Sequence, residues 1–200
     1  MKSHIRSSLS LFTSNCERAD GLRLIYEYLT AISPKALNCD DVLRSALLLC
    51  VSSFDLFMHD IFRTEVVYRI SARRKVDGFK IPFDALFIES SLHPVLVDEQ
   101  IRRENSYKSF VAPDKIAECL RPLLAGSWDK IALEMCLPPT DCKARLKSII
   151  DLRNRIAHEA DVNPSYAGIE LWPIYSVDVE SSIDFLRSLG EAIAKVVDDT

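Results

Sequence analysis

The feature that most constrains this chain is a long apolar stretch in its first third. Between Ala46 and Phe62, apolar side chains fall on nearly every face of an α-helix. A helix of this kind needs neighbours on most sides, so we expect a central helix over about 41–74 that other elements cover. Its one polar strip spans roughly 80° of arc and consists of Ser45, Ser52, Asp55, His59 and Arg63.

The remaining sequence also predicts helices. Apolar residues at helical spacing predict long helices over 4–32, with an interruption near 14–15, and over 177–197. The chain has only 5 glycines and few alternating β patterns, which argues against a sheet. The sequence therefore predicts an all-α fold, in one domain over residues 1–200. Shorter helices are predicted over 82–91, 94–106, 113–124, 128–136 and 141–160.

Charge and cysteine content narrow the functional classes. The formal net charge is −4, so any contact with nucleic acid is expected to be local rather than driven by bulk charge. The 6 cysteines lack the spacing of zinc ligands and are interpreted as reduced thiols. We find no signal peptide and no run of roughly 18 apolar residues, the length of a membrane span. These observations predict a cytoplasmic protein without a metal site.

One arginine contradicts the pattern of its own helix. At about 100° per residue, Arg153 lies at the centre of an apolar stripe whose residues all project within about 60° of it. An unpaired buried charge is costly, so Arg153 must be paired, line a wet cleft or face a partner chain. His158 projects about 140° away from Arg153. Either the helix unwinds near His158, or a second chain completes the site. The stripe consists of Leu146, Ile149, Ile150, Ile156 and Ala157.

The spacing of these residues resembles a known motif. Arg153 and Asn154, followed by three residues and His158, resemble the R-(N/D/H)-x3-H motif of the HEPN superfamily. Segments 41–60, 110–116 and 128–131 are similar, in the same order, to the RiboL-PSP type of HEPN domain. This resemblance implies an all-α, HEPN-like bundle around a long central helix. It also implies a homodimer, and many HEPN proteins are endonucleases that cut RNA without a metal.

The resemblance assigns roles to the motif residues, and each has a structural alternative. His158 is the expected general base or acid, and the alternative is a histidine that interacts with the last helix carbonyls. Arg153 is expected to stabilise a crowded phosphate; alternatively a carboxylate holds it, with Asp55 the best placed by family position. Asn154 is expected to orient either His158 or Arg153. The alternative is that Asn154 is an exposed helix residue without a role.

Four basic residues are candidates for contacts with RNA phosphates. Lys147 and Arg155 lie on the motif helix, and Arg73 and Arg74 lie at the basic end of the central helix. The alternative for all four is an ordinary solvated position. We expect few phosphate contacts, because the dense basic clusters are short.

The resemblance to HEPN domains therefore implies a metal-independent endoribonuclease that needs no cofactor. The ribose 2′-OH would attack the adjacent phosphodiester and leave 2′,3′-cyclic phosphate ends. The family resemblance further implies a toxin or defence effector, with an antitoxin or defence-system protein as partner. The competing hypothesis is a non-catalytic interaction or sensor module that uses the motif for dimer packing, which the negative charge favours.

Overall fold

A computed structural model describes residues 1–32, 38–80, 88–165 and 170–200. Helices account for the fold, and the described residues contain no strand beyond one isolated bridge between Val162 and Leu171. The predicted all-α class is confirmed. The elements are α1 (Ser3–Ile32), α2 (Asp40–Ser71), the 3-10 turn η2 (Ser90–Leu92), α3 (His93–Asn105), α4 (Pro113–Leu120), α5 (Ser127–Glu134), α6 (Pro139–Glu159) and α7 (Ser176–Asp198).

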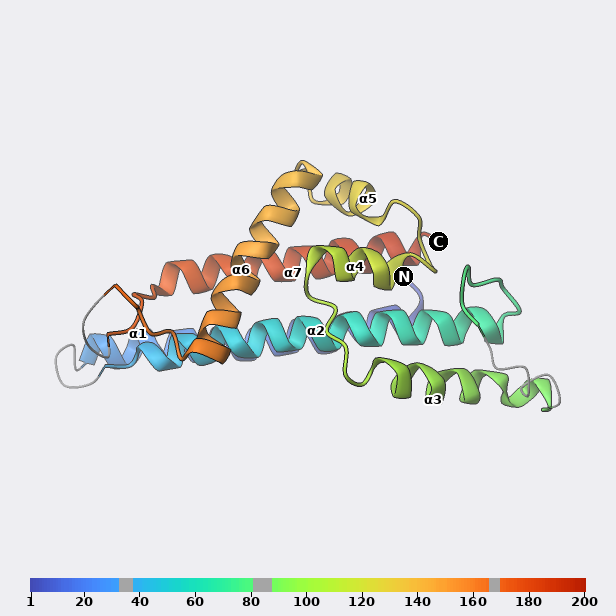
Figure 1. Ribbon diagram of the computed structural model, residues 1–200, viewed down its shortest axis with the longest axis horizontal. Helices are drawn as coiled ribbons and strands as arrows, with labels where there is room; N and C mark the ends of the chain where they lie inside the picture. The colour runs from blue at the N-terminus through green and yellow to red at the C-terminus, as the bar shows by residue number, and fades with distance from the viewer. Residues whose placement is uncertain (33–37, 81–87, 166–169) are drawn as a thin grey trace.

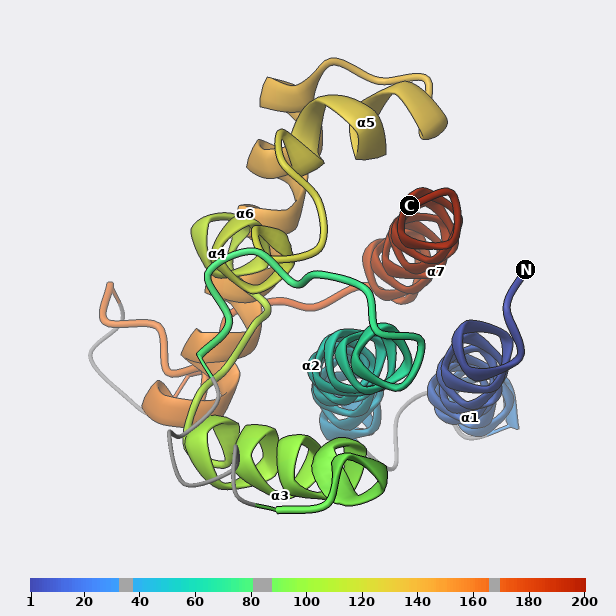
Figure 2. The same cartoon turned by 90° about the vertical axis from the view of Figure 1, so that its right-hand side faces the viewer.

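The long apolar helix lies at the centre of the bundle, as predicted. α2 packs along α1 and α7, while α3 covers another side and α6 crosses α2 obliquely (Figures 1 and 2). Figure 2 looks nearly along the axes of α1, α2 and α7, and shows α5 and most of α6 on the side of α2 away from α3. This arrangement gives α2 the partners that its apolar surface requires.

An aromatic cluster joins α1, α2 and α7. The Phe12 ring stacks on Phe57 at 5.0 Å between centroids and lies 5.8 Å from Phe54. Phe12 also fills the space that a side chain at Gly190 would occupy, because a Cβ there would lie 2.4 Å from its Cε1. The glycine in α7 therefore allows the close approach of α1.

The predicted helices agree with the structure more closely in position than in length. α1 runs without the expected interruption near 14–15. The helix predicted over 113–124 ends at Leu120 and that over 128–136 ends at Glu134, each followed by turn residues. Most of the helix predicted over 82–91 lies outside the described residues, and only η2 occupies its end.

The apolar character of α2 needs one correction to the sequence analysis. By length and composition this helix could cross a membrane, whereas the sequence was predicted to contain no such run. In the fold, 56% of its most apolar 18-residue stretch is buried. Its hydropathy is thus that of the central helix of a bundle.

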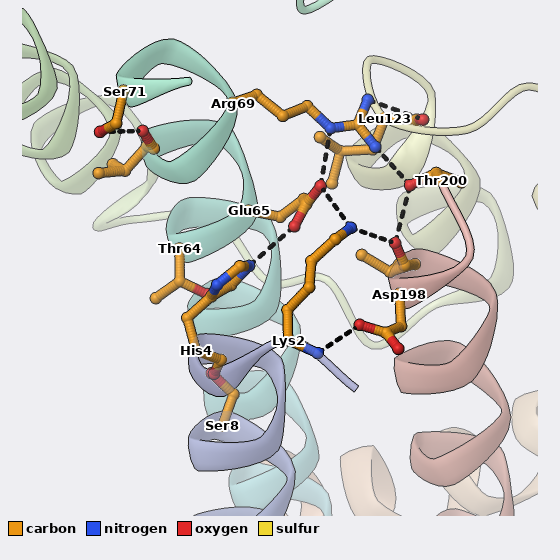
Figure 3. Close-up of polar contacts among 12 residues, drawn as sticks. Lys2, His4, Ser8, Thr64, Glu65, Arg69, Ser71, Leu123, Asp198 and Thr200 are labelled. Carbon is orange, nitrogen blue, oxygen red and sulfur yellow. Dashed lines mark hydrogen bonds and ion pairs between the residues drawn. The ribbon is translucent and has the colours of Figure 1, made fainter. Parts of the chain in front are cut away.

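A buried carboxylate ties both ends of the described chain to α2. Glu65 is fully buried, and its oxygens lie 2.8 Å from Arg69 Nε, 2.8 Å from His4 Nε2 and 3.3 Å from Lys2 Nζ (Figure 3). The backbone N–H of Lys2 donates to Asp198 in α7 at 2.6 Å. Arg69 also donates to the Thr200 hydroxyl. The cluster therefore fixes α1 and α7 against the same turn of α2.

This cluster predicts acid sensitivity. Burial would raise the pKa of Glu65, but hydrogen bonds from Arg69, His4 and Lys2 outweigh burial, so the pKa lies below its ordinary value. The carboxylate therefore contributes stability above the ordinary pKa of about 4.3, and this contribution is lost as the pH falls through the lower folded value. Urea titrations at pH 5.5 and pH 3 should show a smaller loss of stability for Glu65→Gln than for the wild type. An equal loss in both proteins would contradict this assignment.

Candidate functional site

The motif lies on α6 and remains helical to its end. Pro139 takes the first helical position, where proline is well tolerated, and the helix continues through His158 to Glu159. Ala160 and Asp161 then adopt left-handed conformations with φ of 49° and 56°. The helix therefore does not unwind near His158, which removes one of the two explanations for the angle between Arg153 and His158.

Arg153 lacks a carboxylate partner among the described residues. Its Nη1 donates to the Asn154 side chain at 3.0 Å. Its Nε is buried without a hydrogen-bond partner, and no other buried side-chain nitrogen or oxygen in the described part of the chain is left in this state. Leaving a charged donor unsatisfied costs more than the roughly 1–3 kcal/mol of a neutral one. Such an atom calls for a ligand or a partner chain.

The carboxylate expected beside Arg153 lies elsewhere. Asp55 Oδ1 accepts the backbone N–H of Phe110 at 2.7 Å and lies 3.8 Å from His59 Nε2. Asp55 thus anchors the segment before α4 to the central helix, and the described residues show no ion pair between it and Arg153. The alternative in which Asp55 holds the guanidinium does not describe this structure.

His158 is exposed near the C-terminal end of α6. The described residues provide no hydrogen bond or ion pair to its imidazole. The side-chain amide oxygen of Asn154 accepts a hydrogen bond from Arg153 rather than from the histidine. At about 100° per residue, Lys147, Asn154 and His158 share one face of α6. Lys147 is itself paired with Asp151 at 2.6 Å. The imidazole is therefore free to meet a substrate or a second chain.

A buried ion-pair cluster fixes the end of the motif helix. Asp161 is fully buried, and its Oδ2 accepts Arg44 Nε of α2 at 2.8 Å. Its Oδ1 accepts Arg155 Nε of α6. Arg44 also donates to the Trp172 carbonyl at 2.7 Å, and the Trp172 N–H donates to the Asp161 carbonyl at 2.9 Å. We call Arg44, Arg155, Asp161 and Trp172 the Asp161 clamp.

The Asp161 clamp was not predicted from the sequence. Asp161 resembled an ordinary turn residue, and nothing in the spacing linked it to Arg44, which precedes it by 117 positions. The clamp also changes the view of Arg155, which was predicted to contact RNA. Its guanidinium is paired with Asp161 and lies 5.1 Å from the centroid of the Trp172 ring. The structural partners of Arg155 account for its presence, and a phosphate contact from it stays a prediction.

The chain also matches a known protein family. The model of the RiboL-PSP-HEPN family matches residues 17–199, from within α1 to the end of α7. The chain belongs to the RiboL-PSP-HEPN family. The resemblance inferred from the Arg153–His158 motif is confirmed. Comparisons with curated proteins and with solved structures found no match.

The RiboL-PSP-HEPN chain does not bring all the predicted basic residues together. α6 meets α2 near Arg44 through the Asp161 clamp, whereas Arg73 and Arg74 follow the other end of α2 (Figure 1). At 1.5 Å per residue, about 40 Å of helix separates the two regions. Arg74 donates to the Thr200 carbonyl at 2.7 Å, and Arg73 is exposed. Any RNA contact by these two arginines would therefore lie far from the motif.

Two other kinds of reactive group are a metal centre and a cysteine thiolate. The described residues contain no group of three or more histidine, cysteine or acidic side chains placed to hold a metal ion. All six cysteines are free thiols, and four of them are buried. Burial raises the pKa of Cys119 and of Cys142, which disfavours their thiolate forms.

Proposed function

We propose that this RiboL-PSP-HEPN protein is an endoribonuclease that cuts RNA without a metal. The observation that carries the proposal is the Arg153 guanidinium, half-buried with an unsatisfied Nε and no carboxylate partner among the described residues. A cation without a carboxylate partner suits an anionic ligand, because a phosphate would balance the charge of the guanidinium. The exposed His158 on the same helix supplies a group that exchanges protons near neutral pH.

In the proposed reaction, His158 takes the proton of a ribose 2′-OH. The 2′-oxygen attacks the adjacent phosphorus, the bond to the 5′-oxygen breaks, and the departing oxygen takes a proton from an acid or from water. The products are a 2′,3′-cyclic phosphate and a 5′-OH. Arg153 stabilises the charge that develops on the phosphate, and its hydrogen bond to Asn154 orients the guanidinium. DNA lacks the attacking hydroxyl and is not a substrate.

We further propose that the site is completed by a second copy of the chain. Arg153 and His158 project about 140° apart on a helix that does not unwind. A two-fold axis beside α6 would bring the arginine of one protomer to the histidine of its partner. Family membership supports this proposal, and also a cytoplasmic role as a toxin or defence effector with an antitoxin or defence-system partner.

The activity is tested by incubating the purified protein with single-stranded RNA in the presence of EDTA. We expect cleavage to persist, DNA of the same sequence to stay intact, and the new 3′ ends to resist end-labelling until the cyclic phosphate is opened and the resulting monophosphate is removed. Loss of cleavage on chelation, or equal cleavage of DNA, would refute the proposed chemistry. Absence of cleavage would favour the non-catalytic interaction module, in which the unpartnered Arg153 Nε is satisfied by the partner chain.

The shared site is tested by mixing two inactive variants. If Arg153 of one chain serves His158 of its partner, a mixed dimer of Arg153→Ala and His158→Ala chains contains one intact site of two. When the two variants are mixed in equal amounts, half of the dimers contain one chain of each variant. About a quarter of wild-type activity should therefore return. Light scattering should give a mass near twice 22.6 kDa. No recovery after verified chain exchange would place the complete site within one chain.

A further inference from the structure

One face of α6 connects His158 to a hollow at the other end of the helix. Counting about 100° per residue, Lys143, Ala144 and Lys147 all project within about 60° of His158. All four residues are exposed. A strand that follows this face from His158 therefore meets the three others without passing round the helix.

The hollow lies where α4, α5 and α6 meet. It has a volume of about 480 Å³ and is lined by Pro113, Asp114, Ala117, Trp128, Lys143, Ala144 and Lys147. The volume lies in the range of about 300–1,000 Å³ that is typical of small-molecule sites. Trp128 is held in place because its Nε1 donates to the Pro113 carbonyl at 2.8 Å. The lining is mainly apolar, with charged groups at its edge.

The charge at this edge differs from that of the whole chain. Lys143 has no carboxylate partner among the described residues, and its Nζ lies 5.6 Å from the centroid of the Trp128 ring. A second hollow of about 350 Å³ shares Ala117, Trp128 and Lys143 with the first and adds Arg121, which is exposed. The acidic side chains that line the two hollows are Asp114 and Asp129. With Asp151, which pairs with Lys147, three cations thus face three carboxylates, on a chain with a net charge of −4.

We propose that this hollow is a subsite for one nucleotide of the RNA, away from the bond that is cut. The apolar lining suits a nucleobase, and Lys143 and Lys147 suit the phosphates on either side of it. Lys147 pairs with Asp151, but both side chains are more than half exposed, so a phosphate competes easily for the ammonium. Lys147 precedes His158 by a helical rise of roughly 16 Å, a distance that about five stacked nucleotides span at 3.4 Å each.

This subsite rests on the proposed function, since RNA is the occupant to which the hollow is assigned. A protein segment is the competing occupant of an apolar hollow. Two observations favour RNA: the Lys143 ammonium at the edge, which has no carboxylate partner among the described residues, and the continuity of the face with His158. The subsite predicts that affinity depends on length, because only a strand that extends beyond His158 reaches the lysines.

The test measures fluorescence anisotropy of labelled oligouridylates of 3 and 12 nucleotides, in a His158→Ala background that prevents cleavage. We expect the 12-mer to bind at least tenfold more tightly than the 3-mer. The Lys143→Glu/Lys147→Glu variant should reduce this advantage to about threefold or less. It should also make the salt dependence shallower, by about 0.7 per lost phosphate contact. A matched control makes the same charge changes on α1, at Arg6 and Arg18, which lie away from the hollow.

A second variant tests the hollow without changing charge. Ala144→Leu keeps a good helix former at an exposed position and fills part of the cavity. It should weaken binding of the 12-mer several-fold, with an unchanged far-ultraviolet circular dichroism spectrum. An equal loss from the α1 control, or no loss from both hollow variants, would overturn the subsite. If the wild type cuts RNA while the hollow variants bind the 12-mer normally, the subsite fails and the proposed function stands. If the hollow variants lose binding but the wild type never cuts RNA, the subsite stands as a binding site and the proposed nuclease fails.

Discussion

Replacing His158 or Arg153 by alanine is expected to lower the rate of RNA cleavage by roughly a hundredfold or more. His158→Ala removes the general base, whose loss typically costs about 10²–10⁴ in rate. Arg153→Ala removes the cation that stabilises the transition state, an effect of about 10²–10³ for a single donor. Single-turnover kinetics with a labelled RNA would measure both rates, and the decisive quantity is the ratio to wild type at saturating protein.

Arg153→Lys separates charge from geometry. Lysine keeps a cation but has neither the planar fork nor an Nε–H in the same place, so we expect it to recover little of the lost rate. His93→Ala and Arg187→Ala are the matched controls, because these residues lie on α3 and α7 rather than on the motif helix. Cleavage by the His158→Ala protein at the wild-type rate would show that another group takes the proton.

The helices of this chain could be predicted because each is encoded by its own short segment. The apolar surface of Ala46–Phe62 required a covered central helix, and α2 has that place. The periodic stripe over 177–197 likewise corresponds to α7, which buries the residues of that stripe. The boundaries were less accurate, because α4 and α5 end in turns whose residues continue the apolar pattern.

The candidate site could be predicted only in part. The motif identified α6 and the unusual position of Arg153, and the structure shows this arginine half-buried, with no carboxylate partner among the described residues. The neighbours of the motif depend on contacts between distant segments. Asp55 was expected at Arg153 but binds the Phe110 N–H, because the chain before α4 passes over α2 at that point. The apolar pattern of one helix does not predict where a distant segment of the chain crosses it.

The Asp161 clamp gives the largest expected effect on stability. Asp161 is fully buried between Arg44 and Arg155, so Asp161→Asn leaves Arg155 facing a neutral amide and leaves Arg44 only its pair with the exposed Asp41 at 3.3 Å. Breaking a buried ion pair from one side typically costs about 3–5 kcal/mol, because the remaining charge stays desolvated. Urea unfolding should therefore show a lower midpoint with an unchanged slope. Asp184→Asn is the control, since its pair with Arg187 is largely exposed and should contribute less than about 1 kcal/mol.

Asp161→Asn should also affect the candidate site, because it loosens the end of the motif helix. Arg155 lies three residues before His158, and Asp161 lies three residues after it, so the clamp spans the turn of α6 that carries the imidazole. Without the clamp, the last turn of α6 loses its tie to α2 through Arg44 and should fray. Hydrogen exchange should then accelerate at the amides of residues 155–161 more than in α7. If Asp161→Asn lowers stability by less than about 1 kcal/mol and leaves this exchange unchanged, packing rather than the clamp holds the end of the motif helix.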